Sequence, residues 1–205
     1  KGPLDILDHA ANELALGGKM GIDLTGPRLD YSCPKYNEAI SEMAAYRSSQ
    51  PSIIDVNLHL LKEDISIGLV QINKQERLAV KTLASELIAF SELRNIKFWV
   101  FVDSDLDKIT WYEVAWLVGS NVDPLRDCYL FEQENGKEGF LAINATRKSE
   151  KLDDFKRDWP NPVVMSPDII EKIDQNWKNY KIPGTSQSPS LRYQKMMRGD
   201  GAVSE

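Results

Sequence analysis

Three alternate carboxylates are the clearest candidates for chemistry in this sequence. Asp103, Asp105 and Asp107 directly follow the apolar run Phe98–Val102. Carboxylate oxygens are the ligands that hard divalent cations prefer, and open α/β sheets bind ligands at the carboxyl ends of their strands. The EF-hand pattern fails, because the required glycine is missing and Val114 stands at the last-ligand position. Two interpretations stay open: a divalent-cation site, or solvated carboxylates that cap the next helix.

A compact charged turn follows, with the sequence Val122-Asp123-Pro124-Leu125-Arg126-Asp127. Arg126 could hold an anion there. Alternatively, Arg126 forms a salt bridge with Asp123, Asp127 or the Asp103 group and fixes the loop. We favour the salt bridge, and we predict a structural role for this turn.

Other catalytic patterns are incomplete. The only histidines are His9 and His59, so a histidine-based metal site or a Ser-His-Asp triad would need long-range assembly. Gly17-Gly18-Lys19 departs from the phosphate-binding Walker A motif, because Glu13 replaces its first glycine and Met20 its Ser or Thr. The sequence therefore predicts no catalytic residue and no cofactor-binding residue in this chain.

Composition narrows the class of protein. The 205 residues carry a net charge of −6, and an acidic surface repels phosphate backbones, which argues against a nucleic-acid partner. The run Phe98–Val102 is far too short to cross a bilayer, and no signal peptide is visible. Cys33 and Cys128 lie far apart in the sequence and form no CxxC motif, which favours reduced, unpaired thiols. We expect a cytoplasmic protein without a transmembrane segment.

The elements that position these residues follow a strand–helix–strand pattern. Residues 65–72 are rich in β-branched side chains, residues 78–90 show helical spacing, and Phe98–Val102 is a second, buried strand. Such a connection implies a βαβ unit at about 65–102 with parallel strands. Further strands are predicted at Cys128–Phe131 and Gly139–Ile143. The expected fold class is α/β, with a mixed, mostly parallel sheet and flanking helices.

Helix signals frame this sheet. Helical character runs from Asn37 to Tyr46, and Thr110-Trp111-Tyr112-Glu113 fits a capping box that starts a helix through about Val118. Ser166-Pro167 starts a last helix, whose apolar residues at helical spacing are Ile169, Ile170, Ile173, Trp177 and Tyr180. That face could mediate contacts between subunits. Residues 183–205 turn polar, which predicts a flexible tail.

Several motifs resemble the C-terminal region of UbiD-family decarboxylases. Gly18-Lys19-Met20-Gly21-Ile22-Asp23-Leu24-Thr25 is one, and the Asp-rich strand end with the turn Val122–Asp127 is another. Arg157-Asp158-Trp159-Pro160 and the last helix are similar to the closing part of that family. The resemblance extends over residues 3–182.

The resemblance implies a specific chemistry for a parent enzyme. UbiD-like carboxy-lyases remove the carboxylate of aromatic or unsaturated acids, such as the 3-polyprenyl-4-hydroxybenzoate type of ubiquinone or menaquinone biosynthesis. They use prenylated FMN and a divalent metal, manganese or magnesium. Their catalytic residues and metal ligands lie mainly in an upstream flavin-binding domain, which no stretch of this chain matches. Implied partners are that upstream catalytic domain and further copies of the chain, as a homo-oligomer.

The motif order suggests a duplicated C-terminal module. In the UbiD family this motif follows the Asp-rich strand and the charged turn, whereas here Gly18–Thr25 precedes them. A degenerate version, with Asn144 for Asp and Phe140 for Lys, follows at Gly139–Thr146. We therefore expect residues 1–30 to end a first module copy, 31–182 to form the second copy and 183–205 to be the tail. The residues expected to carry the structural motif are Lys19, Asp23, Thr25, Asp123, Arg126 and Asp127.

Two functions remain open from the sequence. The first is a structural and oligomerisation domain of a UbiD-like carboxy-lyase that decarboxylates an aromatic acid in quinone biosynthesis, with no complete active site of its own. The alternative is an independent, divalent-cation-dependent α/β enzyme that uses Asp103, Asp105 and Asp107.

Overall fold

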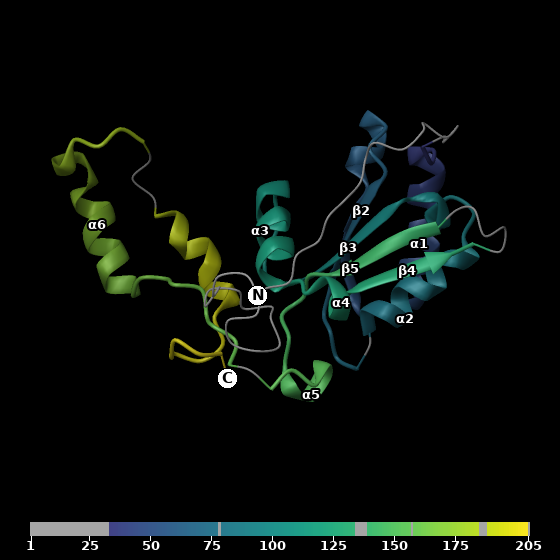
Figure 1. Ribbon diagram of the computed structural model, residues 1–205. Helices are drawn as coiled ribbons and strands as arrows, with labels where there is room; N and C mark the ends of the chain where they lie inside the picture. Colours follow the sequence, from purple (N-terminus) through teal and green to yellow (C-terminus); the bar gives the residue numbers. More distant parts are fainter. Residues whose placement is uncertain (1–32, 78, 134–138, 157, 185–187, 205) are drawn as a thin grey trace, which may run out of the picture. The chain divides into compact units, whose positions relative to one another are not determined.

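The computed structural model describes residues 33–77, 79–133, 139–156, 158–184 and 188–204 (Figure 1). These residues form two compact units. The first comprises the described residues up to Ser104 and from Ile109 to Lys156, and the second comprises Asp105–Lys108 and the described residues from Asp158 onward. Residues 1–30, the expected end of a first module copy, lie outside the described residues, and so do Lys19, Asp23 and Thr25.

A five-stranded mixed sheet forms the centre of the first unit, in the order β1-β2-β3-β5-β4. The strands are β1 (Ile53–Asn57), β2 (Ile67–Ile72), β3 (Phe98–Asp103), β4 (Cys128–Glu132) and β5 (Gly139–Asn144). The three inner strands β2, β3 and β5 are parallel, and the edge strands β1 and β4 are antiparallel to their neighbours. The predicted α/β class with a mixed, mostly parallel sheet is confirmed.

The predicted βαβ unit consists of β2, α2 (Ala79–Glu86) and β3. Gly68 of β2 pairs with Trp99 of β3, and a Cβ atom at residue 68 would lie 2.5 Å from the Trp99 ring. The close approach of the fully buried indole explains why glycine stands in the middle of this buried strand.

Helices complete the first unit. They are α1 (Tyr36–Ser49), α3 (Trp111–Asn121), α4 (Pro124–Asp127), α5 (Glu150–Asp153) and the 3-10 turns η1 (His59–Glu63), η2 (Leu87–Ala89) and η3 (Leu93–Asn95). Helices α1 and α2 pack on one face of the sheet, where Tyr46 and Leu83 join Trp99, Phe101 and Phe140 in one buried cluster (Figure 1). This cluster is the hydrophobic core between the sheet and these two helices.

The capping box predicted for α3 is present. The Thr110 hydroxyl accepts from the Glu113 backbone N–H at 3.3 Å, and the Glu113 carboxylate accepts from the Thr110 N–H at 2.7 Å. Two otherwise orphaned amide donors are thereby satisfied, so α3 begins at Trp111.

The second unit contains α6 (Pro167–Tyr180) and the 3-10 helix η4 (Pro189–Met196). A β-bridge joins Pro160 to Val203, and Lys195 pairs with Asp107 at 2.5 Å. The predicted boundary between residues 182 and 183 therefore falls inside a compact unit. Among the helices of the described residues, none has the length and apolar character needed to span a membrane.

Candidate functional site at the carboxyl ends of the parallel strands

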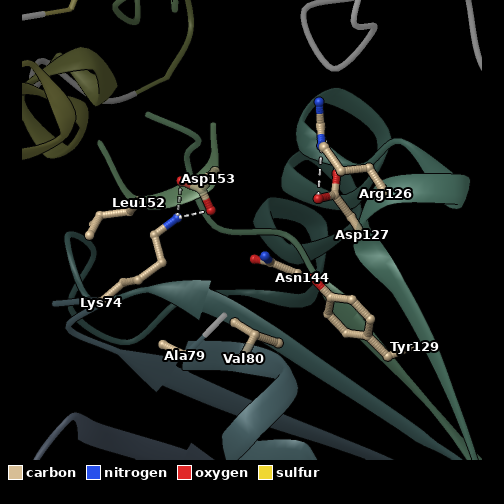
Figure 2. A pocket seen from close by; sticks show the side chains of 9 residues that line it. All are labelled: Lys74, Ala79, Val80, Arg126, Asp127, Tyr129, Asn144, Leu152 and Asp153. Atoms are coloured by element: carbon tan, nitrogen blue, oxygen red, sulfur yellow. Dashed lines mark hydrogen bonds and ion pairs between the residues drawn. The ribbon is translucent and has the colours of Figure 1, made fainter. Parts of the chain in front are cut away.

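Polar side chains gather where the three parallel strands end. Lys74 follows β2, Asp103 ends β3, and Asn144–Lys148 includes the end of β5 and the loop after it. Parallel strands place their carboxyl ends at one edge of a sheet, where α/β proteins bind ligands. A pocket of about 90 Å³ lies at this edge. Its lining residues are Lys74, Ala79, Val80, Arg126, Asp127, Tyr129, Asn144, Leu152 and Asp153 (Figure 2).

Lys74 closes one side of the pocket against α5. Its Nζ donates to the two carboxylate oxygens of Asp153 at 2.9 and 2.8 Å, and Figure 2 shows the two side chains pointing toward each other. The same ammonium donates to the Thr146 hydroxyl at 3.0 Å and to the Arg147 carbonyl at 2.6 Å. Because the Lys74 and Asp153 side chains are only 7% and 10% exposed, this pair is a nearly dry contact between β2, α5 and the β5 loop.

Asp127 organises the opposite side. Its carboxylate accepts from Arg126 Nε at 3.0 Å and Nη2 at 2.6 Å, and from the Asp123 backbone N–H at 2.8 Å. The Asp123 carboxylate caps α4 by accepting from the Leu125 and Arg126 amides. The predicted salt bridge of Arg126 is thus made with Asp127, while Asp123 serves as the N-cap.

Lys148, in the loop after β5, contacts this turn through Asp127. The sequence did not indicate it as a residue of the site. Its side chain is 1% exposed, and its Nζ lies 3.5 Å from an Asp127 oxygen. It donates to the carbonyls of Asn144 at 2.9 Å and Thr146 at 2.6 Å. Burial lowers the pKa of Lys148 to about 8, against the opposing attraction of Asp127. A lysine in a polar loop after a strand is ordinarily exposed, so no local signal identifies it.

Asn144 and Thr146 hold the β5 loop in shape. The Thr146 hydroxyl and N–H donate to the Asn144 side-chain oxygen at 2.6 and 3.2 Å. Asp103 accepts from the Arg147 N–H at 2.6 Å. The segment predicted as a degenerate second motif copy, Gly139–Thr146, forms strand β5 and the start of the turn after it, and the carbonyls of Asn144 and Thr146 accept from Lys148.

Asp103, Asp105 and Asp107 do not converge. Asp103 binds the Arg147 amide in the first unit, whereas Asp105 pairs with Arg198 at 3.3 Å and Asp107 with Lys195 within the second unit. The described part of the chain brings no group of three or more His, Cys, Asp or Glu residues together as metal ligands. The spacing in the sequence therefore does not become a cation site in this geometry.

The arrangement at the sheet edge suits a structural role better than a cofactor site. This edge carries three cations and three carboxylates. The cations are Lys74, Arg126 and Lys148, and the carboxylates of Asp103, Asp127 and Asp153 each accept from a backbone amide or a cation. Ligand pockets of cofactor size measure roughly 300–1,000 Å³. A pocket of about 90 Å³ does not fit a flavin, and the described residues do not fit a divalent metal.

Comparison with known proteins identifies the family. The sequence profile described as the 3-octaprenyl-4-hydroxybenzoate carboxy-lyase C-terminal domain, UbiD_C, matches residues 35–141, more than half of the chain. The matched range contains β1 to β4, the charged turn and the first residues of β5.

Curated relatives extend the match beyond that range. Uncharacterized proteins of two Helicobacter pylori strains, 26695 and J99, are each 28% identical over 174 residues, which cover 84% of this chain. The same alignment covers 26% of each relative, so the chain spans about a quarter of their length.

Solved structures share the fold. The vanillic acid decarboxylase of Sedimentibacter hydroxybenzoicus matches in its open form with a TM-score of 0.51 and 17% identity, over 70% of this chain and 32% of that one. Its closed form matches with a TM-score of 0.51 and 16% identity, over 66% and 30%. These structures show the shared fold, and the profile match over more than half of the chain shows that the chain belongs to the family of UbiD C-terminal domains.

Proposed function

We propose that this chain is the structural and assembly domain of a UbiD-like carboxy-lyase and holds no complete active site. The observation that carries the proposal is the state of the sheet edge. There, the cations that could meet a substrate carboxylate are already bound by Asp127, Asp153 and loop carbonyls. A ligand would have to displace nearly dry internal contacts.

The parent enzyme, in this proposal, decarboxylates an aromatic acid in quinone biosynthesis. Two names support this: the matching profile is named for a 3-octaprenyl-4-hydroxybenzoate carboxy-lyase, and a structural neighbour is named for vanillic acid, another aromatic acid. Prenylated FMN with manganese or magnesium would supply the chemistry from an upstream flavin-binding domain. The chain described here would contribute a rigid α/β body to a cytoplasmic homo-oligomer.

Duplication of the C-terminal module belongs to the same proposal. Residues 1–30 would end a first copy and 31–182 form the second. The rigid loop built by Asn144 and Thr146 supports this idea, because a residue other than Asp keeps the turn through its side-chain oxygen.

Three measurements on the purified 205-residue chain test the proposal, and the parent enzyme is the matched control for the first two. Isothermal titration with prenylated FMN and Mn²⁺ should give no stoichiometric binding, and 4-hydroxybenzoate or vanillate should release no CO₂. Both signals should be present for the parent enzyme. Added to the separately produced flavin-binding part, the chain should co-elute with it. Stoichiometric flavin binding by the chain, or no association with that part, would overturn the assembly role.

A further inference from the structure

The pocket at the carboxyl ends of the parallel strands keeps open space beside its ion pairs. Its volume is about 90 Å³. A water molecule takes about 30 Å³ of the liquid, so this space accommodates roughly three waters or one small anion. An aromatic acid would have to displace the ion pairs of the lining, whereas a ligand of this smaller size enters the space that the pairs leave open.

Two cations line the pocket, together with two neutral hydrogen-bonding side chains. Figure 2 shows Lys74 on one side of the pocket and Arg126 on the other, with Asn144 between them in this view. The Tyr129 hydroxyl and the Asn144 amide are further groups that can donate to an oxyanion. Arg126 is 19% exposed and Lys74 only 7%, so Arg126 is the cation that stands nearer to solvent.

The cations around the pocket outnumber the carboxylates that pair with them. Asp153 pairs with Lys74, but Asp127 serves both Arg126, at 2.6 Å, and Lys148, at 3.5 Å. Lys148 does not line the pocket itself, yet it donates to the carbonyl of Asn144, which does. Three cations thus share two carboxylates, which leaves a formal excess of one positive charge.

The two other carboxylates nearby are held by backbone amides. Asp103 accepts from the Arg147 N–H, and Asp123 accepts from the first amides of α4. Neither carboxylate lines the pocket. The excess positive charge beside the pocket is therefore not neutralised by a third ion pair.

The protonation of Lys148 responds to the same surroundings. Burial is the main cause that lowers its pKa to about 8, and the cations Lys74 and Arg126 lower the pKa further, against the attraction of Asp127 and Asp153. Negative charge close to a buried ammonium stabilises its charged form. An anion in the pocket would supply the charge that the shared Asp127 does not.

We propose that this pocket binds a small monovalent oxyanion, of the size of formate or bicarbonate, between Lys74 and Arg126. The inference goes beyond the assembly role, because such an anion is neither the aromatic acid nor the flavin. Bicarbonate is the hydrated form of the CO₂ that a carboxy-lyase releases, and this choice of ligand rests on the proposed function.

Isothermal titration of the full 205-residue chain with sodium formate tests the site, at pH 7 in a buffer low in chloride. The wild-type chain should bind one formate with a Kd of roughly 1 mM, because a ligand with so few atoms binds weakly even in a fitted site. Sodium bicarbonate should bind at the same site and compete with formate. The larger 4-hydroxybenzoate should give no saturable heat.

A variant that fills the pocket separates this site from general attraction of anions. Ala79 lines the pocket and is 4% exposed. Ala79→Leu occupies the space and leaves every charge in place, so formate binding should weaken by at least roughly tenfold. Ala115→Leu, the same change at an exposed position of α3, is the matched control and should bind formate as wild type does.

A second variant removes the third cation and leaves the lining intact. Lys148→Met should weaken formate binding by roughly tenfold, and Lys156→Met, at an exposed lysine, should leave the affinity unchanged. Circular dichroism shows whether each variant is folded, and Ala79→Leu decides the matter if Lys148→Met is not.

No saturable heat from formate and bicarbonate, or equal affinity for formate in wild type and a folded Ala79→Leu variant, overturns the anion site. Either result leaves the assembly role standing, because that role is judged by flavin binding and by association with the flavin-binding part.

Discussion

Lys148 and Asp127 form a buried ion pair, with the Lys148 Nζ 3.5 Å from the Asp127 carboxylate and both side chains 1% exposed. The pair connects the loop after β5 with α4, and Arg126 adds a second cation to the same carboxylate at 2.6 Å. A lysine is rarely buried so completely. Its burial is tolerated here because the ammonium donates to two carbonyls and lies beside a carboxylate.

Replacement of Lys148 by Met should destabilise the first unit. The carbonyls of Asn144 and Thr146 would lose a buried donor and Asp127 a nearby cation, at a cost of roughly 3 kcal/mol in the free energy of unfolding. Urea unfolding followed by circular dichroism measures this value. Lys156→Met, at an exposed lysine, should change it by less than about 0.5 kcal/mol. Equal losses for the two variants would contradict a specific role of Lys148.

Stability should depend on pH through the same lysine. The pKa of Lys148 is lowered from 10.5 to about 8, with Asp127, Lys74, Arg126 and Asp153 as the surrounding charges. Below pH 8 the ammonium is charged in both states, and its burial opposes folding. Between pH 8 and 10.5 the unfolded chain binds one more proton than the folded chain, so the free energy of unfolding rises with pH.

The gain attributable to Lys148 should reach about 3 kcal/mol at the upper end of that pH window. It is measured as the difference between wild type and Lys148→Met in urea unfolding from pH 7 to 10.5, since tyrosines and cysteines titrate in both chains. A difference that stays constant, or that shrinks as pH rises, would show that Lys148 is not titrating with a lowered pKa.

Two ion pairs between the same parts of the chain should differ sharply in their contribution to the free energy of unfolding. Lys74–Asp153 is 7% and 10% exposed, whereas Arg77–Asp154 is 59% and 69% exposed. Asp153→Ala should cost roughly 3 kcal/mol, because it leaves the Lys74 ammonium buried without its carboxylate. Arg77→Ala should cost less than about 1 kcal/mol, because water screens that pair. Thermal or urea unfolding of both variants checks the order, and similar costs would refute it.

Two glycine substitutions should have opposite signs. At Gly68 an added Cβ would lie 2.5 Å from the Trp99 ring, so Gly68→Ala should destabilise the sheet by about 1–3 kcal/mol. At Gly119, inside α3, an added Cβ would meet nothing within 4 Å. Gly119→Ala should therefore stabilise the chain by up to about 1 kcal/mol, through better helix propensity. Unfolding midpoints that move in the same direction would contradict the packing at Trp99.

Local patterns explain which elements the sequence predicted. The strand at Phe98–Asp103, the capping box at Thr110 and the helix that begins at Pro167 each depend on residues within a few positions of one another. Their side-chain types restrict the backbone before any distant contact forms. The edge strand Ile53–Asn57 escaped prediction, because only Ile53 is fully buried and a bulge interrupts its pairing after that residue.

The family and the general fold class were likewise determined by the sequence, because the motifs and the strand–helix–strand pattern consist of short stretches of consecutive residues. Tertiary structure alone decided the partners of the charged groups that meet across long separations in the sequence. Lys74 meets Asp153 from 79 residues away, and of the three alternate aspartates Asp103 binds the Arg147 amide, whereas Asp105 pairs with Arg198 and Asp107 with Lys195. Contacts between charges depend on where loops place side chains after the strands have paired. Spacing along the chain cannot encode that placement, because it is set by the packing of the whole unit.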